Sequence, residues 1–248
     1  MKTTPIAFCV LFSVGCSAAP DADDAVDSVA PEQRSDRAIV FAPGAHPLGR
    51  SMIDWSQRWW QWIFAVPAAE NPMLDVTGVH CDEGQEGPVW FLASVLDPGG
   101  TATISRACTL PKGKPVLISP ASLLNDYPCP NPDFHPAPGQ SLYDFLREGA
   151  RPAVDIVNGM TITLDGRTVA HPFDYRYASP HLFSIRGDVS LKPVLDGCIT
   201  GTRQPAVMDG YFMMLKALDE GAHRLTVRVT DTKGTDVTVD WTLTVRGR

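Results

Sequence analysis

The feature that most constrains the fold is a series of short apolar segments with turn residues between them, which fills the chain from about residue 89 onward. The clearest is 237–245, where apolar residues occupy every second position. Such alternation is typical of a strand with one buried face. The 20 glycines and 22 prolines are spread along 248 residues, which favours many short elements over a few long helices.

Roughly nine to eleven such segments predict a mainly β protein: one antiparallel β-sandwich or jelly-roll-like domain over 38–248. The segments 89–96, 101–108 and 116–119 are expected to form an antiparallel meander. Asp165-Gly166 predicts a two-residue hairpin turn between 160–164 and 167–170.

Helices are expected as insertions in this β framework. The strongest helical signal is at 51–66, where Ser51 and Asp54 form a capping-box-like start and Pro67 follows the end. The segment holds four of the six tryptophans, Trp55, Trp59, Trp60 and Trp62. Its apolar side chains span an arc of roughly 200°, which predicts a helix sunk into the core. The alternative is an aromatic platform for sugar rings or an apolar ligand.

A second helical region is expected after a long proline-rich loop. Ser141 and Asp144 predict a short helix that ends at Gly149, and Pro152 is expected to start another.

The first 37 residues are expected to lie outside the domain. Residues 1–16 resemble a secretion signal, with an apolar stretch too short for a bilayer, which takes about 20 residues. Their end, Ser13-Val14-Gly15-Cys16, resembles a bacterial lipobox, so Cys16 is the predicted lipidation site and ordinary cleavage nearby is the alternative. Residues 17–37 hold six acidic residues, two arginines and no apolar period, which predicts a disordered tether.

This N-terminus predicts export, with the protein either lipid-anchored to the bacterial cell envelope (outer membrane or periplasm) or secreted. A membrane is expected as a partner only through the lipid anchor. Residues 38–248 carry 18 basic and 22 acidic side chains without a basic cluster. Nucleic acid is therefore not an expected partner.

Four cysteines follow the signal: Cys81, Cys108, Cys129 and Cys198. An even number at wide spacing in an exported protein predicts two disulfides. Three pairings exist. Cys81–Cys108 with Cys129–Cys198 is favoured, because the first pair flanks the expected hairpin.

Familiar catalytic and cofactor motifs are absent, including the nucleophile elbow, the phosphate-binding loop, the dinucleotide fingerprint and His-Glu-x-x-His. No catalytic residue, metal site or cofactor is predicted, and binding is favoured over catalysis.

Several motifs together resemble a family of uncharacterised exported proteins and lipoproteins from bacteria and some archaea. The resemblance covers most of 51–225 and rests on the tryptophan-rich helix, Asn71-Pro72 with Asp75-x-Thr77-Gly78, Cys81 with Gln85-x-Gly87-Pro88-Val89-Trp90-Phe91-Leu92, Cys108-Thr109-x-Pro111-x-Gly113-Lys114, and Asp209-Gly210-Tyr211 with Gly221-x-His223. The family implies export and a single domain but no established activity. It also implies that Cys81 and Cys108 belong together.

The leading hypothesis is a non-catalytic binding or envelope-accessory protein, with a glycan or other cell-surface ligand. The site is expected where the helix end meets the 75–85 loops, and Trp60 is chosen because it lies at the edge of the apolar arc and should be partly exposed. The predicted binding residues are Trp60, Asn71, Asp75, Gln85 and Glu86.

Two alternatives stay open. The first is a secreted hydrolase that uses the loop carboxylates Asp75, Asp82, Glu83 and Glu86. The second is a structural domain whose partner is another envelope protein.

Overall fold

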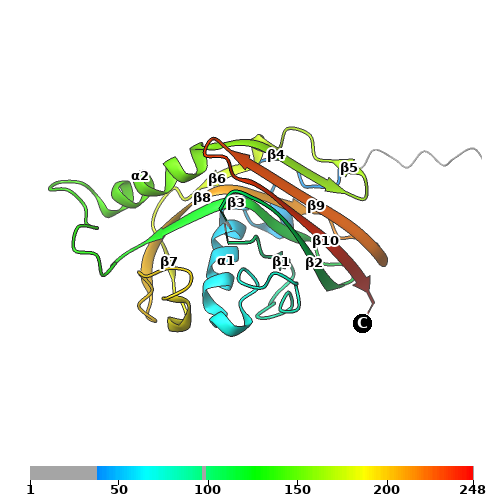
Figure 1. Ribbon diagram of the computed structural model, residues 1–248, viewed down its shortest axis with the longest axis horizontal. Helices are drawn as coiled ribbons and strands as arrows, with labels where there is room; N and C mark the ends of the chain where they lie inside the picture. Colours follow the sequence, from blue (N-terminus) through cyan, green and yellow to red (C-terminus); the bar gives the residue numbers. More distant parts are fainter. Residues whose placement is uncertain (1–37, 97–98, 248) are drawn as a thin grey trace, which may run out of the picture. The chain divides into compact units, whose positions relative to one another are not determined.

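The computed structural model describes residues 38–96 and 99–247. They belong to one compact unit, Arg37–Arg248. Two five-stranded sheets and two α-helices make up its regular structure, which confirms the mainly β, sandwich-like fold (Figure 1). The expected signal, the lipidation site Cys16 and the tether lie outside the described residues. Within the described part, no helix is long and apolar enough to cross a membrane.

The two sheets differ in how they are covered, and we call them the central and the outer sheet. The central sheet contains β1 (Trp90–Leu92), β3 (Val116–Asp126) and β8 (Gln204–Leu215), with β6 (Arg176–Ala178) and β7 (Phe183–Ile185) both paired to β8. The outer sheet runs in the order β2 (Thr101–Pro111), β10 (Asp236–Arg246), β9 (Gly221–Asp231), β4 (Val157–Leu164) and β5 (Arg167–Thr168). Four short 3-10 helices connect the elements: Pro47–Gly49, Ala68–Glu70, Pro172–Tyr175 and Val189–Leu191.

The central sheet is buried on both faces, which explains the continuous apolar runs of its strands. Ile118 and Met213 belong to the core between the two sheets. Their neighbours Leu117 and Met214 belong to the core beneath α1, the helix Met52–Ala65. Figure 1 shows α1 below the curved strands β3 and β8.

The tryptophans of α1 confirm the expectation of a core helix. Trp59 is fully buried, and its indole N–H donates to the carbonyl of Leu92 at 2.9 Å. Trp55 and Trp62 donate in the same way to Pro47 and Glu83, both at 2.9 Å. Three indole groups thus join the helix to three surrounding segments: a 3-10 helix, strand β1 and the loop at Glu83. The helix begins as expected, with the Ser51 hydroxyl accepting from the Asp54 N–H at 3.1 Å.

The expected meander is wrong. β1 pairs with β3 in parallel, and β2 lies in the outer sheet in parallel beside β10. The two strands differ in burial. All residues of β1 are buried, whereas in β2 only Arg106, Cys108 and Leu110 are fully buried. A strand with one buried face belongs in an outer layer.

The second helical region is also not as expected. One helix, α2 (Leu142–Asp155), runs through both Gly149 and Pro152. Leu146, Ala150 and Val154 recur every four residues on its buried side, and this packing outweighs the helix-breaking tendency of glycine and proline. The Asp165-Gly166 turn between β4 and β5 is confirmed, with φ values of 50° and 77°.

Both favoured disulfides are confirmed. Cys81–Cys108 spans 27 residues and Cys129–Cys198 spans 69. Cys81 and Cys108 are buried in the core between the sheets. The second disulfide joins the loop after β3 to the segment before β8. Two disulfides indicate an extracellular or otherwise oxidising compartment.

Candidate functional site

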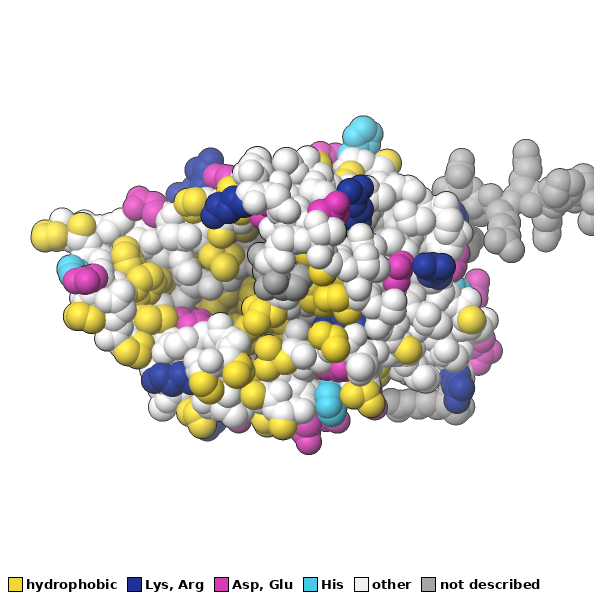
Figure 2. Space-filling view, viewed as in Figure 1, with side chains coloured by type: hydrophobic (Ala, Val, Ile, Leu, Met, Phe, Trp, Pro, Cys, Tyr) yellow, Lys and Arg dark blue, Asp and Glu magenta, His cyan; other side chains and the backbone are white. Residues whose placement is uncertain are grey.

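A mainly apolar cavity among the described residues has a volume of about 510 Å³ and lies beside β3. Its walls are mostly apolar. Trp60 and Phe64 come from α1, and Val239 and Trp241 come from β10. The face drawn in Figure 2 is hollowed near its middle, and hydrophobic side chains gather around the hollow.

The cavity runs along an edge of the central sheet and not over one of its faces. Seven consecutive residues, Ile118 to Leu124, line it. Side chains of a strand alternate between the two faces, so only a cavity beside the edge can touch every residue in turn. For the same reason its walls come from both cores, that beneath α1 and that between the sheets.

The edge of β3 is open because its neighbour stops early. β1 pairs with β3 only from Val116 to Ile118. Pro120 follows, and proline has no N–H to donate to a neighbouring strand. A bulge between Ile118 and Ala121 lets β3 continue along β8 to Asp126 on its other side. Among the described residues, no strand pairs with this part of the outer edge of β3.

A buried arginine holds the chain after β1 away from that edge. Arg106 is 2% exposed, and its Nη1 donates to the carbonyls of Ala93 and Ser94 at 3.1 and 3.3 Å. Its guanidinium carbon lies 5.2 Å from the centre of the Trp241 ring. Segment 92–96 therefore forms a wall of the cavity instead of a longer β1.

Arg106 is charged although it is buried. Removal from water lowers its pKa to about 10, while attraction to Asp75 acts in the opposite direction. Its Nε and Nη2 have no hydrogen-bond partner in the part of the chain that the structure describes. Two carbonyls and an aromatic ring thus provide its short-range stabilisation.

Trp60 stands apart from the other tryptophans of α1. It lines the cavity, and its indole N–H has no partner within 38–96 and 99–247. The expectation that Trp60 is partly exposed is wrong, because only 6% of it is accessible. Contacts with Trp59 and Phe64 bury the ring, at 5.2 and 5.7 Å between centroids.

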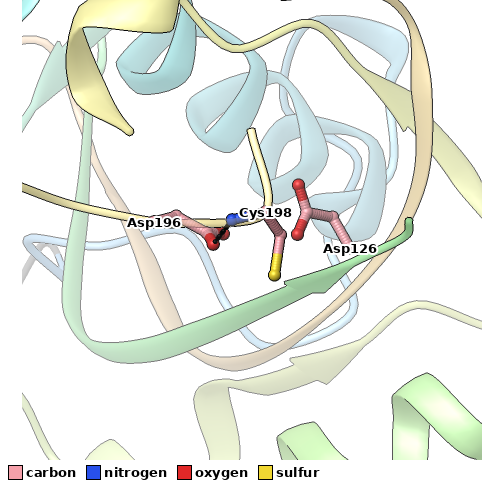
Figure 3. A group of neighbouring side chains, drawn as sticks. All are labelled: Asp126, Asp196 and Cys198. Carbon is pink, nitrogen blue, oxygen red and sulfur yellow. Dashed lines mark hydrogen bonds between the residues drawn. The ribbon is translucent and has the colours of Figure 1, made fainter. Parts of the chain in front are cut away.

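A pair of carboxyl groups lies at one end of the cavity, where Asp196 is part of the lining. Asp126 at the end of β3 lies beside Asp196 and Cys198 (Figure 3). Burial, repulsion from Asp196 and a hydrogen bond with Asp196 raise the pKa of Asp126 to about 8. Gln204 fixes the pair by donating from Nε2 to Asp126 Oδ2 at 2.6 Å.

This group of three residues is poorly suited to a metal ion. The sulfur of Cys198 is bonded to Cys129, so it is not available as a thiolate ligand. The raised pKa of Asp126 keeps that carboxyl group protonated at neutral pH. We therefore interpret Asp126 as a protonated carboxyl group that is hydrogen-bonded to Asp196.

The residues predicted to bind a ligand do not come together around one pocket. Trp60 lines the cavity beside β3, whereas Gln85 borders a separate, more open polar pocket with Lys112 and Lys114. The side chain of Gln85 is already engaged, donating to the Cys81 and Phe91 carbonyls at 3.0 and 2.7 Å and accepting from the Phe91 N–H at 3.0 Å. Glu86 is exposed on the same loop.

Asp75, one of the loop carboxylates, is a poor candidate for the general acid of a hydrolase. Burial acts to raise the pKa of Asp75, but hydrogen bonds from the His80 N–H and from Thr77 outweigh it and lower the pKa to about 2. A general acid needs a pKa near the working pH. Asp82 is exposed, and the Glu83 carbonyl accepts from the indole of Trp62.

Asn71 has a structural role. It is 1% exposed and closes the end of α1, with Nδ2 donating to the carbonyls of Ile63 at 2.6 Å and Val66 at 3.0 Å. Its Oδ1 accepts from the Met73 N–H at 3.0 Å. All of its polar atoms are used within the fold.

We expect Asn71→Ala to lower the free energy of unfolding by about 3 kcal/mol, because several buried polar groups lose their partner. Asn131→Ala is the matched control, since the Asn131 side chain is exposed and accepts one bond, from the Asp133 N–H. It should change stability by less than about 0.5 kcal/mol. Denaturant unfolding of both variants checks this, and equal losses would contradict a special role for Asn71.

No protein-family model matches the chain. No curated protein matches it either. Among solved structures it is similar to one described as the structure of PbICP-C in complex with falcipain-2, with 10% sequence identity and a TM-score of 0.24 over 64% of this chain and 100% of that chain. A TM-score this low indicates neither a shared fold nor a shared function.

Proposed function

We propose that this protein binds an apolar ligand in the cavity beside β3 and performs no chemistry on it. The cavity itself carries this proposal. Protein interiors contain few voids larger than a water molecule, whereas ligand sites typically measure about 300–1,000 Å³ and have mainly apolar walls. A cavity of about 510 Å³ walled by Trp60, Phe64, Val239 and Trp241 falls in that class.

The polar groups of the cavity support binding better than catalysis. Asp196 and Asp231 lie among its polar lining residues, together with the lysine Lys233 and several hydroxyl groups. The carboxyl group with a raised pKa, Asp126, is held by Gln204 and Asp196. Asp196 favours its protonated form, and Gln204 holds it in place by donating to Oδ2, which favours a structural role.

This proposal keeps the non-catalytic binding expected from the sequence and changes the ligand. A glycan platform would need an accessible ring near free polar groups, but Trp60 is buried and Asn71 and Gln85 are engaged. An apolar ligand in an exported protein is consistent with the two disulfides. Export, the lipid anchor at Cys16 and membership of the exported-protein family remain part of the proposal.

Binding can be tested with Nile red, an uncharged dye whose emission rises in apolar surroundings. We expect the purified protein to bind it and Ala121→Phe to weaken binding at least 10-fold, because Ala121 lines the cavity and a phenylalanine ring would fill it. Ala222→Phe is the matched control, since Ala222 is an exposed residue of β9 outside the lining.

Two results would overturn the proposal. One is the absence of Nile red binding to the wild-type protein. The other is equal binding by wild type, Ala121→Phe and Ala222→Phe, which would place the dye elsewhere on the surface. Far-ultraviolet circular dichroism confirms that both variants keep the β fold.

A further inference from the structure

We propose that the occupant of the cavity is an extended apolar segment of another polypeptide, which adds to the central sheet as a strand beside Ala121–Leu124. This inference rests on the proposed function and narrows its ligand to a polypeptide. The edge of β3 is open beyond its short pairing with β1. From Ala121 onward β3 pairs with β8 alone among the described strands. Every second residue of such an edge directs its N–H and C=O outward, away from its single partner.

The edge is accessible as well as unpaired. Ala121, Ser122 and Leu123 are each partly exposed, whereas the preceding residues Val116 to Ser119 are buried. The neighbouring segment is fixed at a distance, because Arg106 holds the carbonyls of Ala93 and Ser94. Another bond, from the Leu96 N–H to the Met73 carbonyl at 3.4 Å, leads the chain toward the loop after α1.

The shape of the cavity suits a strand. Seven residues of β3 line it, and at about 3.3 Å per residue they span about 20 Å. A cavity of about 510 Å³ drawn out over that length is narrow and elongated. Side chains of an added strand would point alternately to its two sides. Both sides are apolar: Trp60 and Phe64 lie on one, and Val239 and Trp241 on the other.

Two features separate a polypeptide from a lipid chain as the occupant. A lipid chain would fill the same apolar space but could not use the outward N–H and C=O groups of β3, which recognition by strand addition uses for affinity. The charged lining residues are also mainly acidic, with Asp196 and Asp231 against Lys233. They suit a segment with apolar residues in its middle and basic residues at its ends.

The test uses a pool of nine-residue peptides with two lysines at each end and five central positions drawn from Ala, Val, Leu, Ile and Thr. Peptides that bind the immobilised full chain are resynthesised with a fluorescent label. Each is also made with N-methyl groups on its odd or on its even central amides. An added strand directs only one of these sets toward β3.

We expect one methylation pattern to weaken binding at least 10-fold and the other to change it less than 2-fold. Hydrogen exchange at outward amides of Ala121–Leu124 should slow when the unmodified peptide binds. Ala121→Phe should abolish binding, and Ala222→Phe should not affect it. Hydrogen exchange distinguishes an added strand from apolar side chains that merely enter the cavity.

Three results would overturn the inference. The first is that the pool contains no binder although Nile red binds. The second is that both methylation patterns weaken binding equally. The third is that hydrogen exchange at Ala121–Leu124 does not change when the peptide binds. In the first case the protein is a binder of small apolar molecules, and in the other two the peptide binds without adding a strand to β3. The proposed function survives in all three. If neither peptides nor Nile red bind, the proposed function itself fails.

Discussion

Asp126→Asn is expected to make the protein more stable at pH 8.5, by several kcal/mol, and to leave its stability at pH 4 nearly unchanged. In the folded protein the pKa of Asp126 rises from 3.8 to about 8, because the group is buried beside Asp196 and hydrogen-bonded to it. Each pH unit of that rise corresponds to about 1.4 kcal/mol. The wild-type protein therefore pays an increasing cost to keep this group protonated as the pH rises.

The sign follows from the direction of the pKa. A raised folded pKa means that the folded state binds more protons than the unfolded state between about pH 4 and pH 8. The stabilisation is complete below the unfolded pKa and is lost as the pH rises through the folded value. Asparagine resembles the protonated acid at every pH: its oxygen can accept from Gln204 and its NH₂ group can donate to Asp196.

Denaturant unfolding at pH 4, 6 and 8.5 measures the effect as the difference between the two proteins. Other titrating groups, such as His223, whose pKa is also raised, contribute to both profiles and cancel in that difference. Asp133→Asn is the control, because Asp133 is an exposed carboxylate on the nearby loop. Parallel profiles for wild type and Asp126→Asn would show that the buried carboxyl pair does not titrate as described.

Removal of the Cys129–Cys198 disulfide in a Cys129→Ser, Cys198→Ser double variant is expected to lower the free energy of unfolding by about 4 kcal/mol. The bond closes a segment with a sequence separation of 69, so its loss greatly increases the freedom of the unfolded chain. For a domain of this size the midpoint of thermal unfolding should fall by about 10 °C.

The matched comparison is a Cys81→Ala, Cys108→Ala variant. Its shorter separation of 27 predicts a smaller loss from chain entropy, about 3.5 kcal/mol, to which the disturbance of a buried pair is added. Only the first double variant should also weaken Nile red binding in the cavity. The reason is that Asp196, which lines the cavity, accepts from the Cys198 N–H at 2.8 Å. Unchanged unfolding of the first variant would contradict the proposed contribution of its disulfide.

Local signals predicted the parts of this fold that depend on neighbours in sequence. The wide apolar arc of 51–66 predicted a buried helix, and Asp165-Gly166 predicted a hairpin turn, because both are set by side-chain period and backbone preference. The parallel pairs β1–β3 and β2–β10 could not be read in this way. Pairing between distant strands depends on which edges meet in three dimensions.

In the candidate site, too, local signals were available in the sequence but the pairing of distant strands was not. The sequence predicts a short third strand over 116–119, which stops before Pro120. The strand in fact continues, since β8 pairs with its other edge across a bulge. Pro120 inside an apolar run was therefore the available signal for an open edge. Arg106 shares one face of 101–108 with Ala102 and Ile104, and this position was a second signal that a charge is buried there.

The carboxyl pair could have been found from the cysteines. Asp126 lies three residues before Cys129, and Asp196 lies two residues before Cys198. Once these cysteines are joined, the two acids are brought close together. The predicted Cys129–Cys198 disulfide therefore indicates that Asp126 and Asp196 lie close together, which the positions of the two acids in the sequence do not indicate by themselves.

The position of β10 has a consequence for how the chain reaches its folded state. It is the last of the described strands, yet it lies between β2 and β9 and pairs with both. Until residues 236–246 have been synthesised, those two strands lack their shared neighbour and leave hydrogen-bonding edges that invite association with other chains. Contacts between residues so far apart in sequence also form slowly. The outer sheet therefore closes only when β10 has taken its place between β2 and β9.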